Sequence, residues 1–199
     1  MLRTNSIWRS VSLSSALLCV TPALPPQPVS PSSLAAPAEK IYLTVEEALE
    51  LALPGCQIEK QTVYLTDAQK KRAGELLGEA LDLAIARPYV ARKDGQLVGV
   101  AYVDVHKVRT LKEALLVVVD AEAKVKRIEL LSFGEPLEYV PKAQWYAQFL
   151  GKQLDDELNL KRAIRPIAGA SLSARATTSA VRRVLAVHGA LNPKGEVRK

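Results

Sequence analysis

Two β-rich runs, each folded about a short polar centre, constrain the fold of this chain more than any other feature. The first run reads RPYVARKDGQLVGVAYVDV and is centred on Asp94 and Gly95. Residues of these types tolerate the positive φ angles of a tight hairpin turn. The second run reads ALLVVVDAEAKVKRIELLSF, with DAEA at its centre. Together the runs predict two β-hairpins, and therefore four strands of a largely antiparallel sheet.

Helical patterns lie on both sides of the hairpins. The TVEEALELAL and TDAQ segments match capping boxes at Thr44 and Thr66, and each predicts a helix. The second of these helices is expected to turn one apolar face inward, formed by Leu76, Leu77, Ala80 and Leu81. Between them, QIEKQTVYL alternates like a strand. After the hairpins, PKAQWYAQFLGK predicts a third short helix and the segment 167–185 predicts a last one. The fold class is therefore α+β.

The N-terminal part of the chain predicts an export signal and a tether. Residues 1–23 contain basic residues, a short apolar core and small residues where a signal peptidase could cut. The apolar run is well short of the roughly 20 residues that span a bilayer. Residues 24–40 are rich in proline, serine and alanine, which is typical of a semi-rigid linker. We therefore expect an exported protein, periplasmic or on the outer face of the cytoplasmic membrane, with a folded domain over 41–188 and a polar tail over 189–199.

Composition argues against several classes of function. The net charge of +6 comes from basic residues scattered among acids, with no basic patch interleaved with aromatic residues, so nucleic-acid binding is not expected. The two cysteines are Cys19, in the predicted leader, and Cys56, which is then alone and can form no internal disulfide. No C-x-x-C-H motif for haem attachment is present, and two histidines are too few for a histidine-rich metal site.

The last helical segment begins with residues that suit an anion better than a packed core. It reads IAGASLSARATTSAVRRVL. The first N–H groups of a helix have no intrahelical partners, and the peptide dipoles make that end positive. Gly169 permits close approach to the main chain, and Ser171 stands at the expected cap with free N–H groups at 172–174 behind it. Arg175 opposes the helix dipole unless an anion is bound. The predicted phosphate site comprises Gly169, Ala170, Ser171, Leu172, Ser173 and Arg175.

Two other interpretations account for parts of this segment. Ser171 can act only as a helix cap, an interaction worth about 1 kcal/mol, while small residues further along let the helix pack on the sheet. The GASLS sequence also resembles the G-x-S-x-G elbow of α/β-hydrolases. However, Ser173 replaces the final glycine of that elbow, and the hairpins do not supply the parallel sheet that it requires. We therefore expect ligand binding or capping rather than hydrolysis.

Several segments, in the right order, resemble the FMN-binding domain family. The stretch IAGASLSARATTSAV is similar to the family's flavin-attachment segment, whose typical form is I-S-G-A-T, one or two hydroxyl residues, an Arg-Ala pair and A-V. Other similar segments are TVEEALELALPGCQIEKQTVYLT, KDGQLVGVAYV, VVVDAEAKVKRIELLSFGEP and WYAQFLGK. The resemblance covers about residues 41–188. The family includes small FMN-carrying subunits of sodium-pumping NADH:quinone oxidoreductase and of the Rnf complex, and the N-terminal domain of NosR-like regulators.

The resemblance implies that FMN is joined through its phosphate to Ser171, which matches the family's acceptor threonine. In the family, a separate flavin transferase uses FAD to make this ester, and the domain then carries electrons outside the cytoplasmic membrane. This chain has Arg165 where the transferase motif usually has an acid, and Ala168 where it has Ser or Thr. Covalent and tightly bound non-covalent FMN therefore both stay open.

Other candidate residues follow from what a flavin ring needs, namely an apolar or aromatic wall and polar groups near its N1 and O2 end. Tyr139 and Trp145 are candidate walls, and Glu135 and Gln148 are candidates for the polar end. His106 lies near the end of a predicted hairpin strand and is a candidate contact to the ring. For the aromatic residues the alternative is packing in the core, and for His106 it is a histidine that faces solvent or is satisfied in the core.

The sequence thus predicts an exported flavoprotein that transfers electrons between redox partners. A turnover enzyme is less favoured, because no acid–base pair for turnover is evident. The expected partners are a flavin transferase and membrane or extracytoplasmic redox proteins, multihaem cytochromes among them. The alternative is a non-redox binding or regulatory module, in which the same site takes an anion or a phosphate ligand without flavin.

Overall fold

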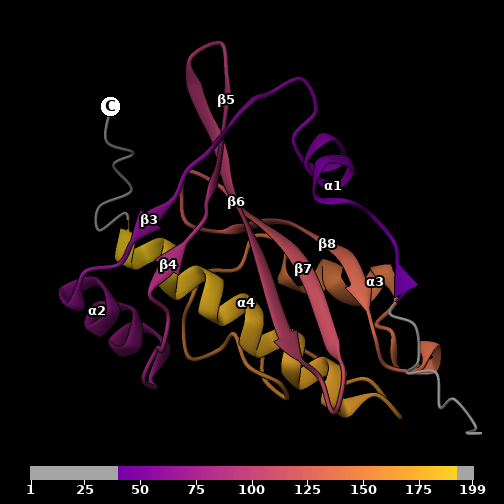
Figure 1. Ribbon diagram of the computed structural model, residues 1–199. Coiled ribbons are helices and arrows are strands. Elements are labelled where there is room, and N and C mark those ends of the chain that lie inside the picture. Colours follow the sequence, from indigo (N-terminus) through magenta and orange to yellow (C-terminus); the bar gives the residue numbers. More distant parts are fainter. Residues whose placement is uncertain (1–39, 192–199) are drawn as a thin grey trace, which may run out of the picture. The chain divides into compact units, whose positions relative to one another are not determined.

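A curled, antiparallel sheet of six strands is the centre of the fold in the computed structural model, which describes residues 40–191 (Figure 1). In spatial order the strands are β1 (Lys40–Ile41), β8 (Val125–Phe133), β7 (Lys112–Val119), β6 (Gln96–Lys107), β5 (Tyr89–Lys93) and β2 (Gln57–Lys60). A two-stranded ladder joins β3 (Val63–Tyr64) to β4 (Ile85–Ala86). The predicted leader, and the tether up to residue 39, lie outside the described residues.

Both predicted hairpins are present. Strands β5 and β6 join through Asp94 (φ 51°) and Gly95 (φ 79°), the positive angles that the dipeptide predicts. Strands β7 and β8 join through a turn in which the Asp120 carboxylate accepts a hydrogen bond from the Lys124 N–H at 2.9 Å. The two hairpins lie side by side because β6 also pairs with β7. The prediction of an α+β fold with a largely antiparallel sheet is confirmed.

The first two helices begin where the capping boxes predict. Helix α1 (Val45–Ala52) is capped by Thr44, and α2 (Asp67–Leu77) by Thr66, each with the reciprocal bond of a capping box. The prediction of the apolar face of the second helix is wrong, because it extends beyond the end of the helix. Gly78 ends α2 in the left-handed region at φ 83°, so Ala80 and Leu81 lie beyond the helix.

Later elements match the predictions with shifted boundaries. The predicted strand QIEKQTVYL is divided into β2 and β3. The short helix around Trp145 consists of α3 (Ala143–Tyr146) and a 3₁₀ turn, η2 (Ala147–Phe149), and another 3₁₀ turn, η1 (Leu137–Tyr139), precedes it. The last helix, α4 (Ser171–Leu191), runs three residues beyond the predicted domain end, and Lys40 belongs to β1 rather than to the tether.

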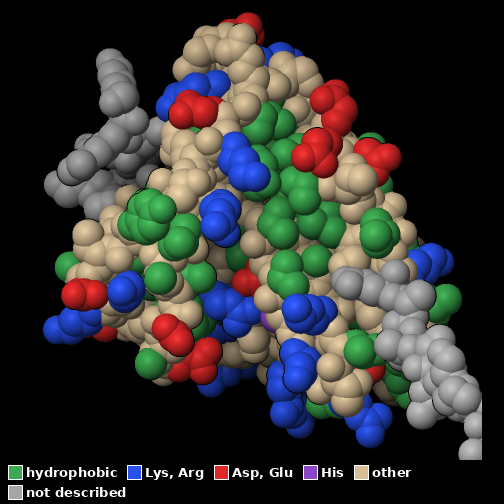
Figure 2. Space-filling model, viewed as in Figure 1, with side chains coloured by type: hydrophobic (Ala, Val, Ile, Leu, Met, Phe, Trp, Pro, Cys, Tyr) green, Lys and Arg blue, Asp and Glu red, His purple; other side chains and the backbone are tan. Residues whose placement is uncertain are grey.

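The core has two parts, one on each face of the sheet. Helix α4 and the η2 residue Phe149 pack on one face, against Leu115 and Val117 of β7. Helix α1 packs on the other face, against Leu116 and Val118. Figure 2 shows hydrophobic side chains gathered at the centre of one face of the molecule. Among residues 40–191, no helix is both long enough and apolar enough to cross a membrane.

We expect the α4 side of the core to be essential for stability. Leu115 is fully buried there, so Leu115→Ala should lower the free energy of unfolding by about 2–5 kcal/mol, measured by urea denaturation. The matched control is Leu51→Ala, because Leu51 is 50% exposed on α1. Equal losses in the two variants would contradict this description of the core.

Candidate functional site

A tight turn precedes α4 and sets where the helix begins. The Ala170 N–H donates to the Ile167 carbonyl at 3.2 Å, and Gly169 has φ 79°, which favours glycine. The first helical bond runs from the Ala174 N–H to the Ala170 carbonyl at 3.1 Å. Ala170 therefore occupies the cap, and the expectation of Ser171 at the cap is wrong, since Ser171 is the first residue of the helix.

The start of α4 therefore has no side-chain cap. Ala170 carries no hydroxyl, so the N–H groups of Ser171, Leu172 and Ser173 have neither an intrahelical partner nor a capping oxygen from the preceding residue. Three donors converge at the positive end of a helix that spans residues 171–191. The main chain alone thus provides favourable conditions for an anion at this point.

A cavity of about 180 Å³ opens at this helix end. Residues 169–173 form one wall, and the opposite wall consists of Val108, Arg109, Glu135 and Tyr139. Ser173 lines this cavity and is 1% exposed, and its Oγ has no hydrogen-bond partner in the described part of the chain. A buried hydroxyl without a partner costs about 1–3 kcal/mol, and such groups are rare. The unpaired hydroxyl points to a ligand with a hydrogen-bonding oxygen.

Glu135 lines the cavity, but its carboxylate is committed to the turn between β6 and β7. Its Oε1 accepts the N–H groups of Arg109, Thr110 and Leu111 at 3.2, 2.6 and 2.7 Å. These bonds, the one from Leu111 first, hold the pKa of Glu135 below its ordinary value. The neighbouring Gly134 lets the turn approach, because a Cβ there would lie 2.9 Å from the Leu111 Cβ. Glu135 thus positions Arg109 at the cavity.

Two other predicted contacts, Trp145 and Gln148, do not line the cavity. The Trp145 indole N–H donates to the Arg165 carbonyl at 2.7 Å, and the Gln148 side-chain carbonyl accepts the Arg165 N–H at 2.9 Å. Both side chains therefore hold the segment that leads into the turn at Ile167. Trp145 also packs edge-on against Tyr146 and Phe149. Their role at the cavity is indirect.

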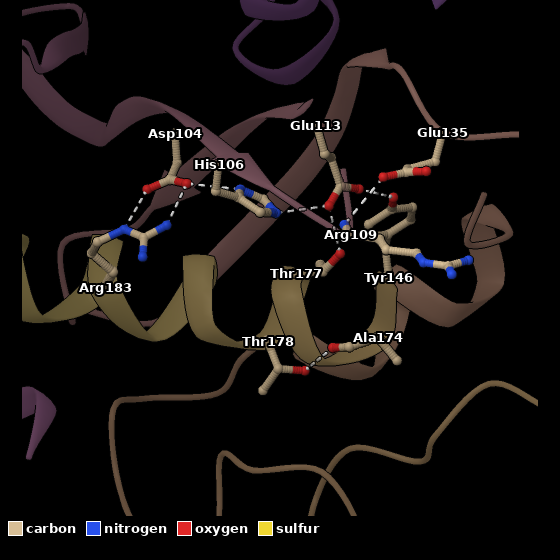
Figure 3. Close-up of polar contacts among 10 residues, drawn as sticks. All are labelled: Asp104, His106, Arg109, Glu113, Glu135, Tyr146, Ala174, Thr177, Thr178 and Arg183. Carbon is tan, nitrogen blue, oxygen red and sulfur yellow. Dashed lines mark hydrogen bonds and ion pairs between the residues drawn. The ribbon is translucent and has the colours of Figure 1, made fainter. Parts of the chain in front are cut away.

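His106 also lies outside the cavity, in a chain of charges that runs from the half-buried Arg183 to the fully buried Glu113. Its Nδ1 lies 2.9 Å from an Asp104 carboxylate oxygen, and its Nε2 lies 2.9 Å from a Glu113 carboxylate oxygen (Figure 3). Arg183 of α4 makes a bidentate pair with Asp104 at 2.8 and 2.9 Å. Positive and negative groups thus alternate from Arg183 through Asp104 and His106 to Glu113.

Glu113 is the end of this chain nearest the cavity-forming turn. It is fully buried on β7 and also accepts the Thr177 hydroxyl at 3.0 Å and the Tyr146 hydroxyl at 3.2 Å (Figure 3). These donors come from α4 and α3. Glu113 therefore joins the sheet to both helices, and it fixes α4 beside the β6–β7 turn.

The charges of this chain set unusual pKa values. Burial opposes the charged His106 ring, but the hydrogen bonds to Asp104 and Glu113 outweigh burial and raise its pKa to about 9. Burial also opposes the charged form of Asp104, yet the bonds from His106 and Arg183 leave its pKa below the ordinary value. By contrast, burial lowers the pKa of His188 to about 4. His106 is therefore a cation at neutral pH, and His188 is uncharged.

The cavity brings together seven of the eleven residues that the sequence predicts, namely Glu135, Tyr139, Gly169, Ala170, Ser171, Leu172 and Ser173. Arg175 is exposed and does not line it. Arg109, which supplies the cation there, was not predicted, although Lys107, Arg109 and Lys112 stand close together in the segment HKVRTLKE. Lys107 and Lys112 face each other at the base of this turn. Figure 2 shows Lys and Arg side chains gathered at the lower end of the view, where Figure 1 places the turn.

Comparisons with known proteins do not indicate a function for this site. No family model matches the chain, and no curated protein has a matching sequence.

We expect the His106 ring to titrate near pH 9, as measured by NMR of the imidazole nitrogens, whereas His188 should not titrate between pH 6 and 10. Because the folded pKa of His106 exceeds the unfolded value, its contribution to stability is complete below about pH 6.5 and is lost as pH rises through about 9. That contribution is on the order of 3 kcal/mol. A His106 ring that loses its proton near pH 6.5 would contradict the charge assignment.

Proposed function

We propose that this protein binds FMN, with the flavin phosphate at the N-terminus of α4, and carries electrons between redox partners. The observation that carries the proposal is the unpaired Ser173 Oγ, which is buried in a cavity beside free helix N–H groups and Arg109. Each of these groups donates hydrogen bonds, and a phosphate offers oxygen acceptors to all of them. The proposal that this phosphate belongs to FMN depends on the resemblance to the FMN-binding domain family.

The size of the cavity supports a particular placement of the flavin. At about 180 Å³ the cavity is below the roughly 300–1,000 Å³ of sites that enclose a drug-sized ligand, so it suits the phosphate and not the whole of FMN. The ring then lies at the mouth, where Tyr139 lines the cavity and Leu172 is 44% exposed. FMN supplies reversible transfer of one or two electrons. A ring at the surface suits exchange with another protein.

Ser171 is suited to be the point of attachment. Its side chain is exposed at the cavity wall, so an external enzyme can reach the hydroxyl. In the covalent form of the proposal, the Ser171 oxygen loses its proton and forms a bond to the phosphorus of the FMN half of FAD. The pyrophosphate bond of FAD breaks and AMP leaves with the proton. The enzyme that supplies FAD is a flavin transferase, and the proposed redox partners are membrane or extracytoplasmic proteins, such as multihaem cytochromes.

The covalent form predicts a defined change in mass. After co-expression with an exported flavin transferase, the denatured wild-type protein should be heavier by FMN less one water, and Ser171→Ala should not be. The change arises because the Ser171 hydroxyl lies exposed at the cavity. An unmodified mass from a protein that is yellow before denaturation would contradict the covalent form and leave bound FMN. A folded, colourless and unmodified protein would contradict flavin binding, and would favour an anion-binding module.

The unpaired hydroxyl predicts opposite effects on stability and on binding. Ser173→Ala should leave the free energy of unfolding of the flavin-free protein unchanged or raise it, because the Oγ loses no hydrogen bond. The same variant should weaken the binding of FMN about tenfold, measured by fluorescence titration. Thr178→Ala is the matched control, since the Thr178 hydroxyl donates to the Ala174 carbonyl at 2.7 Å and does not line the cavity. Unchanged FMN affinity in Ser173→Ala would remove Ser173 from the site.

A further inference from the structure

Half of strand β6 has a neighbour on one side only. Strand β5 pairs with Gln96–Ala101, and its last pair is Tyr89 with Ala101. Beyond that point, residues 102–107 pair with β7 alone in the described part of the chain. The register with β7 runs without a shift from Val100 to Lys107. The second half of β6 is therefore a straight, open edge.

The open edge presents unpaired backbone groups. The Val108 N–H donates to the Leu111 carbonyl at 3.0 Å, which makes this a hydrogen-bonded pair. Because such pairs alternate along an antiparallel ladder, the backbone groups of Tyr102, Asp104 and His106 point toward β7. Those of Val103 and Val105 point away from it, and no strand within residues 40–191 faces them. Each residue thus offers one donor and one acceptor.

A cleft of about 710 Å³ runs along this edge. Residues 102–106 of β6 form one wall, residues 79–87 with β4 form the opposite wall, and Arg183, Val184 and Val187 of α4 lie beneath. The cleft exists because β4 pairs with β3 and not with β6. In Figure 2 it corresponds to the hollow between the lobe that contains α2 and the sheet. Because residues 79–87 close the cleft on its far side, it suits a single extended chain rather than the sheet of a second copy.

The side chains around the cleft define what such a segment must carry. Leu83, Val184 and Val187 are apolar and suit an apolar side chain. Arg183 uses Nε and Nη2 on Asp104, so its Nη1 has no hydrogen bond to the described residues, and Arg87 is exposed at the rim. These two accessible guanidinium groups suit a carboxylate, although Glu79 and Asp82 of the same lining are acidic.

We propose that this cleft binds an extended peptide segment of a partner protein, which adds a strand to the open edge of β6. The segment carries apolar side chains and then a carboxylate at alternate positions, because successive side chains of a strand point to opposite faces. Of the protections that natural edge strands use against pairing, residues 102–107 lack proline and a bulge, and their charged residues are Asp104, His106 and Lys107. Val105 is 57% exposed beside it. This proposal does not depend on flavin binding.

The test uses hydrogen exchange of single amides, measured by NMR on the full chain. In the free protein, the N–H groups of Val103 and Val105 should exchange much faster than those of Tyr102 and Asp104, which bond to β7. The probe is the blocked peptide TVTVTET, and the control peptide TTVVETT has the same composition without the alternation. Saturating TVTVTET should slow the exchange of Val103 and Val105 at least tenfold, and TTVVETT should not.

A pair of variants distinguishes strand pairing from nonspecific binding of the peptide. Val105→Pro removes the outward donor without removing a bond to β7, so it should weaken TVTVTET binding at least tenfold. Val105→Thr keeps the donor and should bind within about twofold of the wild type. Slow exchange of Val103 and Val105 in the free protein, equal binding of both peptides, or no protection at millimolar TVTVTET would overturn the proposal. Protection that grows with protein concentration alone would overturn it in favour of a second copy.

Discussion

The buried carboxylate of Glu113 is the group on which the arrangement of this fold depends. A charged group without solvent is costly unless it is fully bonded, and Glu113 meets that need with His106, Tyr146 and Thr177. These partners belong to β6, α3 and α4, so satisfying one carboxylate fixes three elements at once. His106 is in turn held by Asp104, and Asp104 by Arg183. The start of α4 and the β6–β7 turn are consequently held next to each other, and the cavity lies where they meet.

The cavity differs from this network because some of its hydrogen-bond donors have no acceptor in the described part of the chain. Glu135, its one carboxylate in the wall, is turned toward the β6–β7 turn and bonded to three main-chain N–H groups. What faces the cavity is instead a set of donors, comprising free helix N–H groups, the Ser173 hydroxyl and Arg109. Of these donors the Ser173 hydroxyl is buried, and a protein interior rarely leaves such a group without a partner. An anionic ligand with several oxygens is the simplest group that satisfies them together, and this is the physical basis of the flavin phosphate proposal.

Local signals in the sequence predicted much of the fold. The hairpin at Asp94 and Gly95 and the capping boxes at Thr44 and Thr66 depend on residues within a few positions of each other, and all three are present. The start of α4 was misjudged by one residue, because the turn ending at Ala170 supplies the first helical carbonyl, and propensity alone favours Ser171 at the cap.

The network around Glu113 could not have been predicted in this way. Its bonds join residues 7, 33 and 64 positions apart, and they depend on how the sheet curls against α3 and α4. In the sequence, Glu113 is only a polar residue that precedes an apolar run. Arg109 was missed for a related reason, since nothing local shows that the β6–β7 turn meets the start of α4.

The most direct test of the central claim is the visible absorption spectrum of the full-length protein, after equilibration with excess FMN and removal of unbound flavin. The account predicts a yellow, folded protein whose flavin bands disappear on reduction with dithionite and return in air. The same treatment of Ser173→Ala should retain much less flavin. A wild-type protein that stays folded and colourless would contradict the account, because the donors at the start of α4 would then serve some ligand other than a flavin phosphate.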